Sequence, residues 1–177
     1  MTIRPGRLAL LKAAMAATIT IDVLYVGLKV GGIRVNASSS LPIGLYIKTS
    51  ARRANLVEFC PPEPFAAFSK GRGYRPSGNC PDAAEPLMKP VVATEGDLVE
   101  VSASGVAVNY RLLPNSSPRA GDARNRPLRH WPFGKYRVAA GTVWVVSSFN
   151  QRSFDSRYFG PIPNVCIRSR LLPLLTE

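Results

Sequence analysis

The sequence is most informative at residues 87–97, which read Leu87-Met88-Lys89-Pro90-Val91-Val92-Ala93-Thr94-Glu95-Gly96-Asp97. Residues 86–93 are apolar except for Lys89 and include two adjacent valines, which predicts a β-strand. Gly96-Asp97 is a turn dipeptide, and residues 98–101 predict a second strand after it. This stretch therefore indicates β-structure in which a single lysine lies in an apolar strand.

The remainder of the chain has the same character. The 177 residues are 46% apolar and 19% charged, enough for one ordinary domain with a core. Sixteen prolines and fourteen glycines favour a body rich in loops and strands over a helical bundle. We expect further strands at residues 45–47, 53–59, 106–109, 143–146 and 164–168, a helical turn at 64–70 and a polar loop at 115–129. The predicted fold class is mostly β, an antiparallel coiled β-sheet domain.

Hydroxyl nucleophiles gather in a second box, Ser38-Ser39-Ser40-Leu41-Pro42-Ile43-Gly44-Leu45-Tyr46. A serine needs a base to attack a peptide carbonyl at neutral pH. The single histidine, His130, lies in a basic loop with no carboxylate partner, and we expect a surface role for it. Lys89 can serve if burial lowers its pKa from about 10.4 to about 7–8, and its apolar neighbours favour that shift. A solvated serine-rich turn and an exposed strand lysine are the alternatives.

A third box, near the C-terminus, indicates the type of catalytic chemistry. Residues 153–161, Ser153-Phe154-Asp155-Ser156-Arg157-Tyr158-Phe159-Gly160-Pro161, resemble a conserved box of the type I signal peptidases, which use a Ser–Lys dyad. Residues 87–97 resemble their lysine box. Residues 36–46 are similar to the nucleophile box of the conjugative-transfer branch, the TraF type, whose members mature the pilin of plasmid transfer systems. The resemblance runs from about residue 36 to about residue 173, and it implies a signal-peptidase type of β domain.

The resemblance also implies roles for the serines of the second box. Its spacing from serine to proline selects Ser40 as nucleophile, and Ser38 then matches the serine that helps to form the oxyanion hole. The spacing of standard signal peptidases would select Ser39 instead, so all three serines stay open as candidates.

In the third box, the resemblance implies that Ser153 hydrogen-bonds the amine of Lys89 and orients it. Asp155 is expected to pair with Arg157 and to hold the loop in shape. A carboxylate in contact with Lys89 would raise the lysine pKa, so we favour a structural role for Asp155. Residues 148–150 depart from the Gly-Asp-Asn that usually precedes this box.

The N-terminal segment, residues 1–33, is expected to be a membrane anchor, and residues 34–177 the peptidase domain. Residues 8–30 predict a helix, and the run from 13 to 28 carries one charge, Asp22. With residues 8–11 it approaches the roughly 20 residues that a spanning helix needs. A cleaved signal peptide is the alternative, although no good cleavage site follows. Asp22 is costly in mid-membrane.

Charge and cysteines are consistent with an exported domain. The formal net charge is +12, but the basic residues are scattered and lack aromatic interleaving, so we expect no nucleic-acid binding. Attraction of the basic protein to anionic lipid headgroups is the preferred interpretation of this charge. Cys60 and Cys80 bracket a stiff loop, and we expect a disulfide between them and a free Cys166 in the core. Two buried free thiols are the alternative. No C-x-x-C motif is present, and no metal or cofactor is expected.

These observations lead to one functional hypothesis and two rivals. The leading one is a serine endopeptidase on the periplasmic side of the inner membrane that matures a pilin precursor by acyl transfer. Attack of the pilin's own N-terminus on the acyl-enzyme would give a cyclic product. The rivals are a general signal peptidase for other preproteins and a non-catalytic assembly factor for a pilus or secretion apparatus. Other conjugation proteins are candidate partners.

Overall fold

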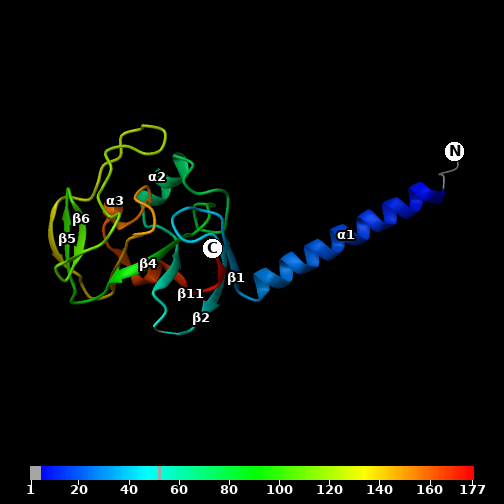
Figure 1. Cartoon of the computed structure of the whole chain (residues 1–177), viewed down its shortest axis with the longest axis horizontal. Helices are drawn as coiled ribbons and strands as arrows, with labels where there is room; N and C mark the ends of the chain where they lie inside the picture. The colour runs from blue at the N-terminus through cyan, green and yellow to red at the C-terminus, as the bar shows by residue number, and fades with distance from the viewer. Residues whose placement is uncertain (1–4, 52) are drawn as a thin grey trace.

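The structure, a computed structural model, describes residues 5–51 and 53–177. Beyond one long N-terminal helix it is made of short strands that pair antiparallel (Figure 1). The helical elements are α1 (Pro5–Val30), α2 (Phe65–Gly71), α3 (Ser156–Phe159) and the 3-10 turn η1 (Asn164–Cys166). The strands are β1 (Ile33–Asn36), β2 (Gly44–Thr49), β3 (Leu56–Phe59), β4 (Leu87–Ala93), β5 (Leu98–Ser102), β6 (Gly105–Val108), β7 (Arg111–Leu112), β8 (Gly134–Arg137), β9 (Thr142–Val145), β10 (Ile162–Pro163) and β11 (Ile167–Thr176). The predicted mostly β class is confirmed.

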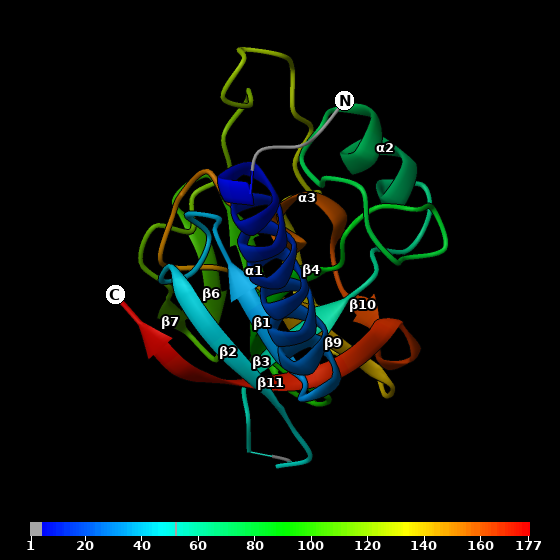
Figure 2. The same cartoon turned by 90° about the vertical axis from the view of Figure 1, so that its right-hand side faces the viewer.

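The strands form two sheets. Within the described residues the larger sheet has seven strands in the order β1-β2-β11-β3-β4-β9-β10, and the smaller has four in the order β7-β6-β5-β8. Figure 2 looks onto the end of the larger sheet where β1, β2 and β11 lie side by side behind α1. β4 passes directly into β5, so the predicted lysine strand links the two sheets.

β9 shows how the sequence pattern builds the core. Its successive residues alternate between two apolar clusters, as the two faces of a strand do. Val143 and Val145 belong to the cluster around Phe59, Phe154 and Phe159. Trp144 belongs to the cluster under the smaller sheet and is 1% exposed. The buried strand predicted at 143–146 is confirmed, and it lies between the two cores.

α1 projects away from the β domain and joins β1 through a glycine pair (Figure 1). The predicted helix at 8–30 is confirmed, while residues 1–4 of the predicted N-terminal segment lie outside the described residues. In the part of the chain that the structure describes, no helix combines the length and hydropathy needed to cross a membrane. The role of this segment as an anchor stays a prediction.

The C-terminal end differs from the expectation. The strand predicted at 164–168 is a 3-10 turn followed by β11, which extends to Thr176 and pairs with both β2 and β3. Pro173 argues against a central strand, but β11 accommodates it near a register shift. The excursion expected at 111–137 also contributes structure, because β7 and β8 at its two ends complete the smaller sheet.

A disulfide fixes the segment between β3 and β4. Cys60 and Cys80 are bonded, which confirms the predicted disulfide, and Cys166 is free as predicted. Cys166 is half-buried, however, and does not lie in the core as expected. Arg75 is buried inside the bridged loop, where it pairs with Asp82 and donates a hydrogen bond to a loop serine. The bridged loop is therefore an ordered segment that contains α2, and its residues Tyr74 and Arg75 line the same cleft as Lys89.

Candidate active site

Lys89 is buried in the middle of β4. It lies opposite Val57 of β3 in the larger sheet and is only 3% exposed, which confirms the predicted burial. Burial disfavours the charged ammonium and lowers the pKa of Lys89 from 10.5 to about 8; Asp155 raises it and Arg157 lowers it. A lysine in this state is neutral in a useful fraction of molecules near neutral pH.

The nucleophile loop, residues 37–42, is shaped by the side chain of Asn36 at the end of β1. Asn36 is 6% exposed, and its amide group lies 3.0, 3.2 and 3.0 Å from the carbonyl oxygens of Ser38, Leu41 and Pro42. Its Oδ1 accepts the backbone N–H of Ser38 at 3.1 Å. Tyr46 donates its hydroxyl to the Pro42 carbonyl at 2.7 Å. One buried amide thus closes the loop that carries the three candidate serines.

The structure separates the three serines. Ser38 and Ser40 line a cleft of about 650 Å³ that Lys89 also lines, whereas Ser39 is not part of its lining. The Ser39 hydroxyl instead accepts a hydrogen bond from Asn150 Nδ2 at 2.8 Å. This geometry favours Ser40 and Ser38 over Ser39 as the residue that meets a substrate.

The hydroxyl of Ser38 already makes a hydrogen bond within the nucleophile loop. It donates to Asn36 Oδ1 at 2.8 Å, so its proton is used within the loop. To donate to an oxyanion, this hydroxyl would have to rotate away from Asn36. The backbone N–H of Ser40 donates no hydrogen bond within the described residues and needs no such change.

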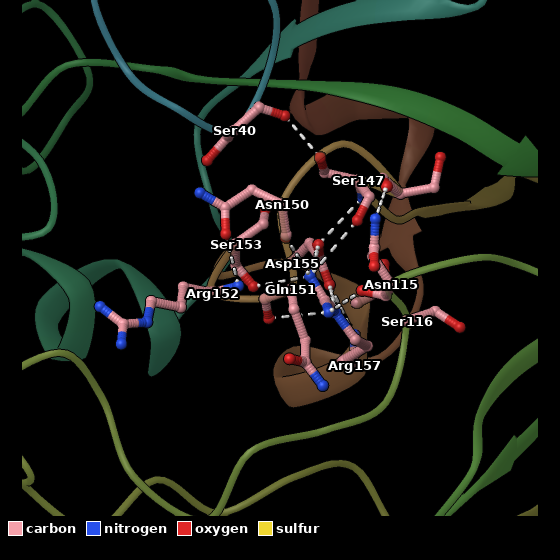
Figure 3. A network of polar contacts seen from close by, with 12 residues as sticks. Ser40, Asn115, Ser116, Ser147, Asn150, Gln151, Arg152, Ser153, Asp155 and Arg157 are labelled. Carbon is pink, nitrogen blue, oxygen red and sulfur yellow. Dashed lines mark hydrogen bonds and ion pairs between the residues drawn. The ribbon is translucent and has the colours of Figure 1, made fainter.

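Asp155 and Arg157 form a buried ion pair, as predicted. Both side chains are 0% exposed, and Arg157 donates Nε to Oδ1 at 2.8 Å and Nη2 to Oδ2 at 2.7 Å. Arg157 also donates to the main-chain carbonyls of Asn115, Gln151 and Ser153 (Figure 3). The pair therefore holds the turn before α3, and within the described residues Asp155 makes no ion pair with Lys89.

Ser147 connects this pair to the nucleophile loop. Its backbone N–H donates to Asp155 Oδ2 at 3.0 Å, and its hydroxyl donates to the carbonyl oxygen of Ser40 (Figure 3). The third box thus reaches the second through one buried serine, across 107 residues of sequence.

Ser153 does not behave as predicted. Within the described residues its Oγ is buried and has no hydrogen-bond partner, so the expected bond to the Lys89 amine is not formed. Its backbone is fixed by two contacts, a donor bond to the Asn150 carbonyl and an acceptor bond from Arg157 Nη2, both at 3.0 Å. The turn therefore sets the hydroxyl where the amine does not reach it in this conformation.

Comparison with known proteins shows the family to which the chain belongs. The sequence profile of the family described as signal peptidase, peptidase S26, matches residues 7–172. The chain belongs to the S26 signal peptidase family. The plasmid transfer protein TraF of Escherichia coli is 39% identical over 149 residues, covering 82% of this chain and 84% of that protein. The probable conjugal transfer protein TraF of Sinorhizobium fredii is 36% identical over 178 residues, covering 98% of this chain and 90% of that protein.

Among solved structures, the signal peptidase I of Enterococcus faecalis aligns with a TM-score of 0.37 and 15% identity over 71% of this chain and 99% of that chain. The resemblance to the TraF-type signal peptidases is confirmed by the family profile and the curated relatives. It covers all three boxes of this S26 peptidase, since the matched residues extend beyond each of them.

Other candidate chemistry lies away from the cleft. His130 is exposed, stacks on Phe133 at a centroid distance of 4.1 Å and is not among the residues that line the cleft. The described residues of this S26 peptidase contain no group of three metal-ligating side chains. Ser38, Ser40 and Lys89 line the cleft, together with the carboxylates of Glu85 and Asp122.

Sequence reasoning missed the residues that support the site. Asn36 was noticed only as a neighbour of the serines, although an asparagine two residues before a serine is a signal for an Asx turn. Ser147 carried no signal, and Asn150 was noted only within residues 148–150, the segment that precedes the third box. The roles of both arise from contacts with residues more than a hundred positions away.

Proposed function

We propose that the protein is a membrane-tethered serine endopeptidase that cleaves a preprotein by acyl transfer from a Ser40–Lys89 dyad. The observation that supports it best is Lys89, which is buried, has a pKa of about 8 and lines the same cleft as Ser40. A buried lysine is costly, and such groups concentrate at functional sites.

In the proposed reaction, neutral Lys89 accepts the proton of the Ser40 hydroxyl as Oγ attacks the peptide carbonyl. The backbone N–H of Ser40 stabilises the oxyanion, joined by Ser38 when its hydroxyl leaves Asn36. The tetrahedral intermediate collapses, Lys89 returns the proton to the leaving amine, and an acyl-enzyme remains. Water then releases the product, with Lys89 acting again as base.

Supporting roles follow from the contacts. Asp155 positions the Ser40 backbone through Ser147 and is held by Arg157, so it is a positioning residue in this proposal. Ser153 orients the Lys89 amine in the reacting state. An unpaired buried hydroxyl costs about 1–3 kcal/mol, and a bond to that amine would satisfy it.

The substrate proposal rests on the relatives, which are named as plasmid and conjugal transfer proteins. We infer that the substrate is a pilin precursor and that an amine can replace water, so that attack by the pilin's own N-terminus yields a cyclic product. Residues 1–33 would anchor the chain and 34–177 would form the peptidase domain on the periplasmic side of the inner membrane, beside other conjugation proteins.

The test uses the full-length protein in detergent with a pilin precursor from the same transfer system, and the product mass as readout. We expect loss of a peptide, with or without one further water, for the natural protein. Ser40→Ala and Lys89→Ala should each abolish it, and the double variant should be no worse, since the residues act as a unit. Ser39→Ala is the matched control and should retain processing.

Three outcomes would change the proposal. Full activity of Ser40→Ala with loss in Ser38→Ala would move the nucleophile. Cleavage of many export signals but not of the pilin would support the general signal peptidase. No Ser40-dependent change in any precursor would favour the non-catalytic assembly factor.

A further inference from the structure

The cleft contains one positive charge that the fold does not use. Arg152 is exposed and lines the same cleft as Ser40 and Lys89. Within residues 5–51 and 53–177 its guanidinium makes no ion pair and no hydrogen bond. Figure 3 shows its side chain directed away from the Asp155–Arg157 network that occupies the other side of the turn.

The backbone that carries Arg152 is nevertheless fixed relative to the serines. Its N–H donates to Asn150 Oδ1 at 2.8 Å, and Asn150 Nδ2 donates to Ser39 Oγ at 2.8 Å. One amide side chain therefore ties the base of Arg152 to the nucleophile loop. Arg152 and Ser40 therefore line one cleft from two segments that this amide links.

The two other arginines of the cleft lining, Arg75 and Arg119, differ in how firmly they are held. Arg75 is buried and paired with Asp82. Arg119 donates to Gln151 Oε1 at 3.3 Å, which places a second, weakly held guanidinium against the same turn. Asp122, which also lines the cleft, already accepts hydrogen bonds from the hydroxyl of Tyr74 and from Arg126. Glu85 of the same lining is exposed, and among the described residues it forms no ion pair with either arginine. Among the described residues, no carboxylate is therefore paired with Arg152 or Arg119 at this turn.

We propose that Arg152, flanked by Arg119, is a subsite for a carboxylate of the substrate, so that preferred peptides carry Asp or Glu close to the scissile bond. The inference rests on the peptidase function proposed above and adds a specificity determinant to it. A guanidinium binds a carboxylate through two parallel N–H donors, which gives orientation as well as attraction. Because Arg152 is exposed, the preference should be moderate and should weaken as salt increases.

The experiment measures cleavage of a peptide library by the full-length protein in detergent. The library holds quenched octapeptides in which Glu, Gln or Lys is fixed at one position at a time and the other positions are mixed. Mass spectrometry locates each cleaved bond. At one position near that bond we expect kcat/KM to be about tenfold higher for Glu than for Gln, equivalent to about 1.4 kcal/mol. Raising salt from 50 mM to 500 mM should reduce the ratio.

Three variants test the residue. Arg152→Gln should bring the Glu-to-Gln ratio close to one, and Arg152→Glu should invert the preference toward a peptide with Lys at that position. Arg111→Gln, an exposed arginine of β7 outside the cleft lining, is the matched control and should keep the natural ratio. The charge swap separates recognition from damage to the fold, because an unfolded variant cleaves neither peptide.

The outcomes distinguish this inference from the proposed function. Ser40-dependent cleavage with equal rates for Glu and Gln at every position would overturn the carboxylate subsite and leave the peptidase intact. A Glu preference that persists in Arg152→Gln would overturn the assignment to Arg152. No cleavage above the Ser40→Ala background would overturn the peptidase proposal and this inference with it.

Discussion

The pH dependence of cleavage tests the proposed base directly. A lysine with a pKa of about 8 is neutral in about one molecule in ten at pH 7, against about one in three thousand for a pKa of 10.5. Activity that requires neutral Lys89 should therefore increase about tenfold in kcat/KM between pH 7 and a plateau above about pH 9. Below pH 7 it should fall by about tenfold for each further unit.

The assay uses a quenched peptide with blocked termini and no titratable side chain, so that the substrate contributes no ionisation between pH 5.5 and 10. Lys89→Arg should be inactive throughout, because a guanidinium stays protonated over this range. Cys166→Ser is the matched control for the free thiol, whose pKa is raised by burial. Its profile should superimpose on that of the natural protein.

Two results would refute the reasoning. A profile that is flat from pH 6 to 10 would exclude a titrating lysine as the base. A midpoint near 10.5 would show that burial does not lower the pKa of Lys89 in solution, and that Asp155 compensates the desolvation of the ammonium.

Two further predictions concern stability. Asp155→Asn leaves Arg157 buried without its partner and should lower the free energy of unfolding, measured in urea at pH 7, by about 3–5 kcal/mol. The control Glu100→Gln loses an exposed ion pair with Lys135 and should lower it by at most about 1 kcal/mol. Equal losses in the two variants would contradict the burial argument. Lys89→Met should stabilise the fold by up to about 3 kcal/mol at pH 7, because the unfolded state holds its lysine proton up to about pH 10.5 and the folded state only to about pH 8. The free energy of unfolding of the natural protein should then rise from pH 8 to 10.5, so that the advantage of Lys89→Met disappears. A difference between the two proteins that stays constant across this pH range would disprove the prediction.

Local patterns were sufficient to predict several parts of this molecule. The apolar neighbours of Lys89 predicted its burial, because a strand of that composition needs cover on both faces. The prolines after Cys60 and Cys80 and the lack of periodicity between them predicted the disulfide. β9 was predicted from its composition, because it is a run of apolar residues bounded by a glycine.

The parts that failed depend on distant partners. β11 includes Pro173, which reads against a strand, and it forms because β2 and β3 offer hydrogen bonds on its two sides. α3 covers four residues of the third box and begins at Ser156, after the N-cap residue Asp155, whose carboxylate accepts the backbone N–H of Arg157. A helix this short has little intrinsic preference, so the tertiary contacts around it decide its place.

The same limit applies to the site. The three boxes could be recognised separately, but the sequence does not show that Ser147 joins the third box to the Ser40 backbone or that Asn36 closes the nucleophile loop. Through these contacts Asp155 reaches the nucleophile loop without an ion pair to Lys89 among the described residues. They also give the serine loop a defined shape although half of its residues, 37–39, are exposed.

Arg157 has a second consequence for the chemistry. Asp155 alone would raise the pKa of Lys89 and keep the amine protonated, which is the wrong direction for a base. Arg157 lowers that pKa while it neutralises Asp155 through two hydrogen bonds, so the pair presents little net charge to the lysine. Burial then sets the pKa at about 8. The buried arginine thus allows a carboxylate to hold the nucleophile loop in place without disabling the neighbouring amine.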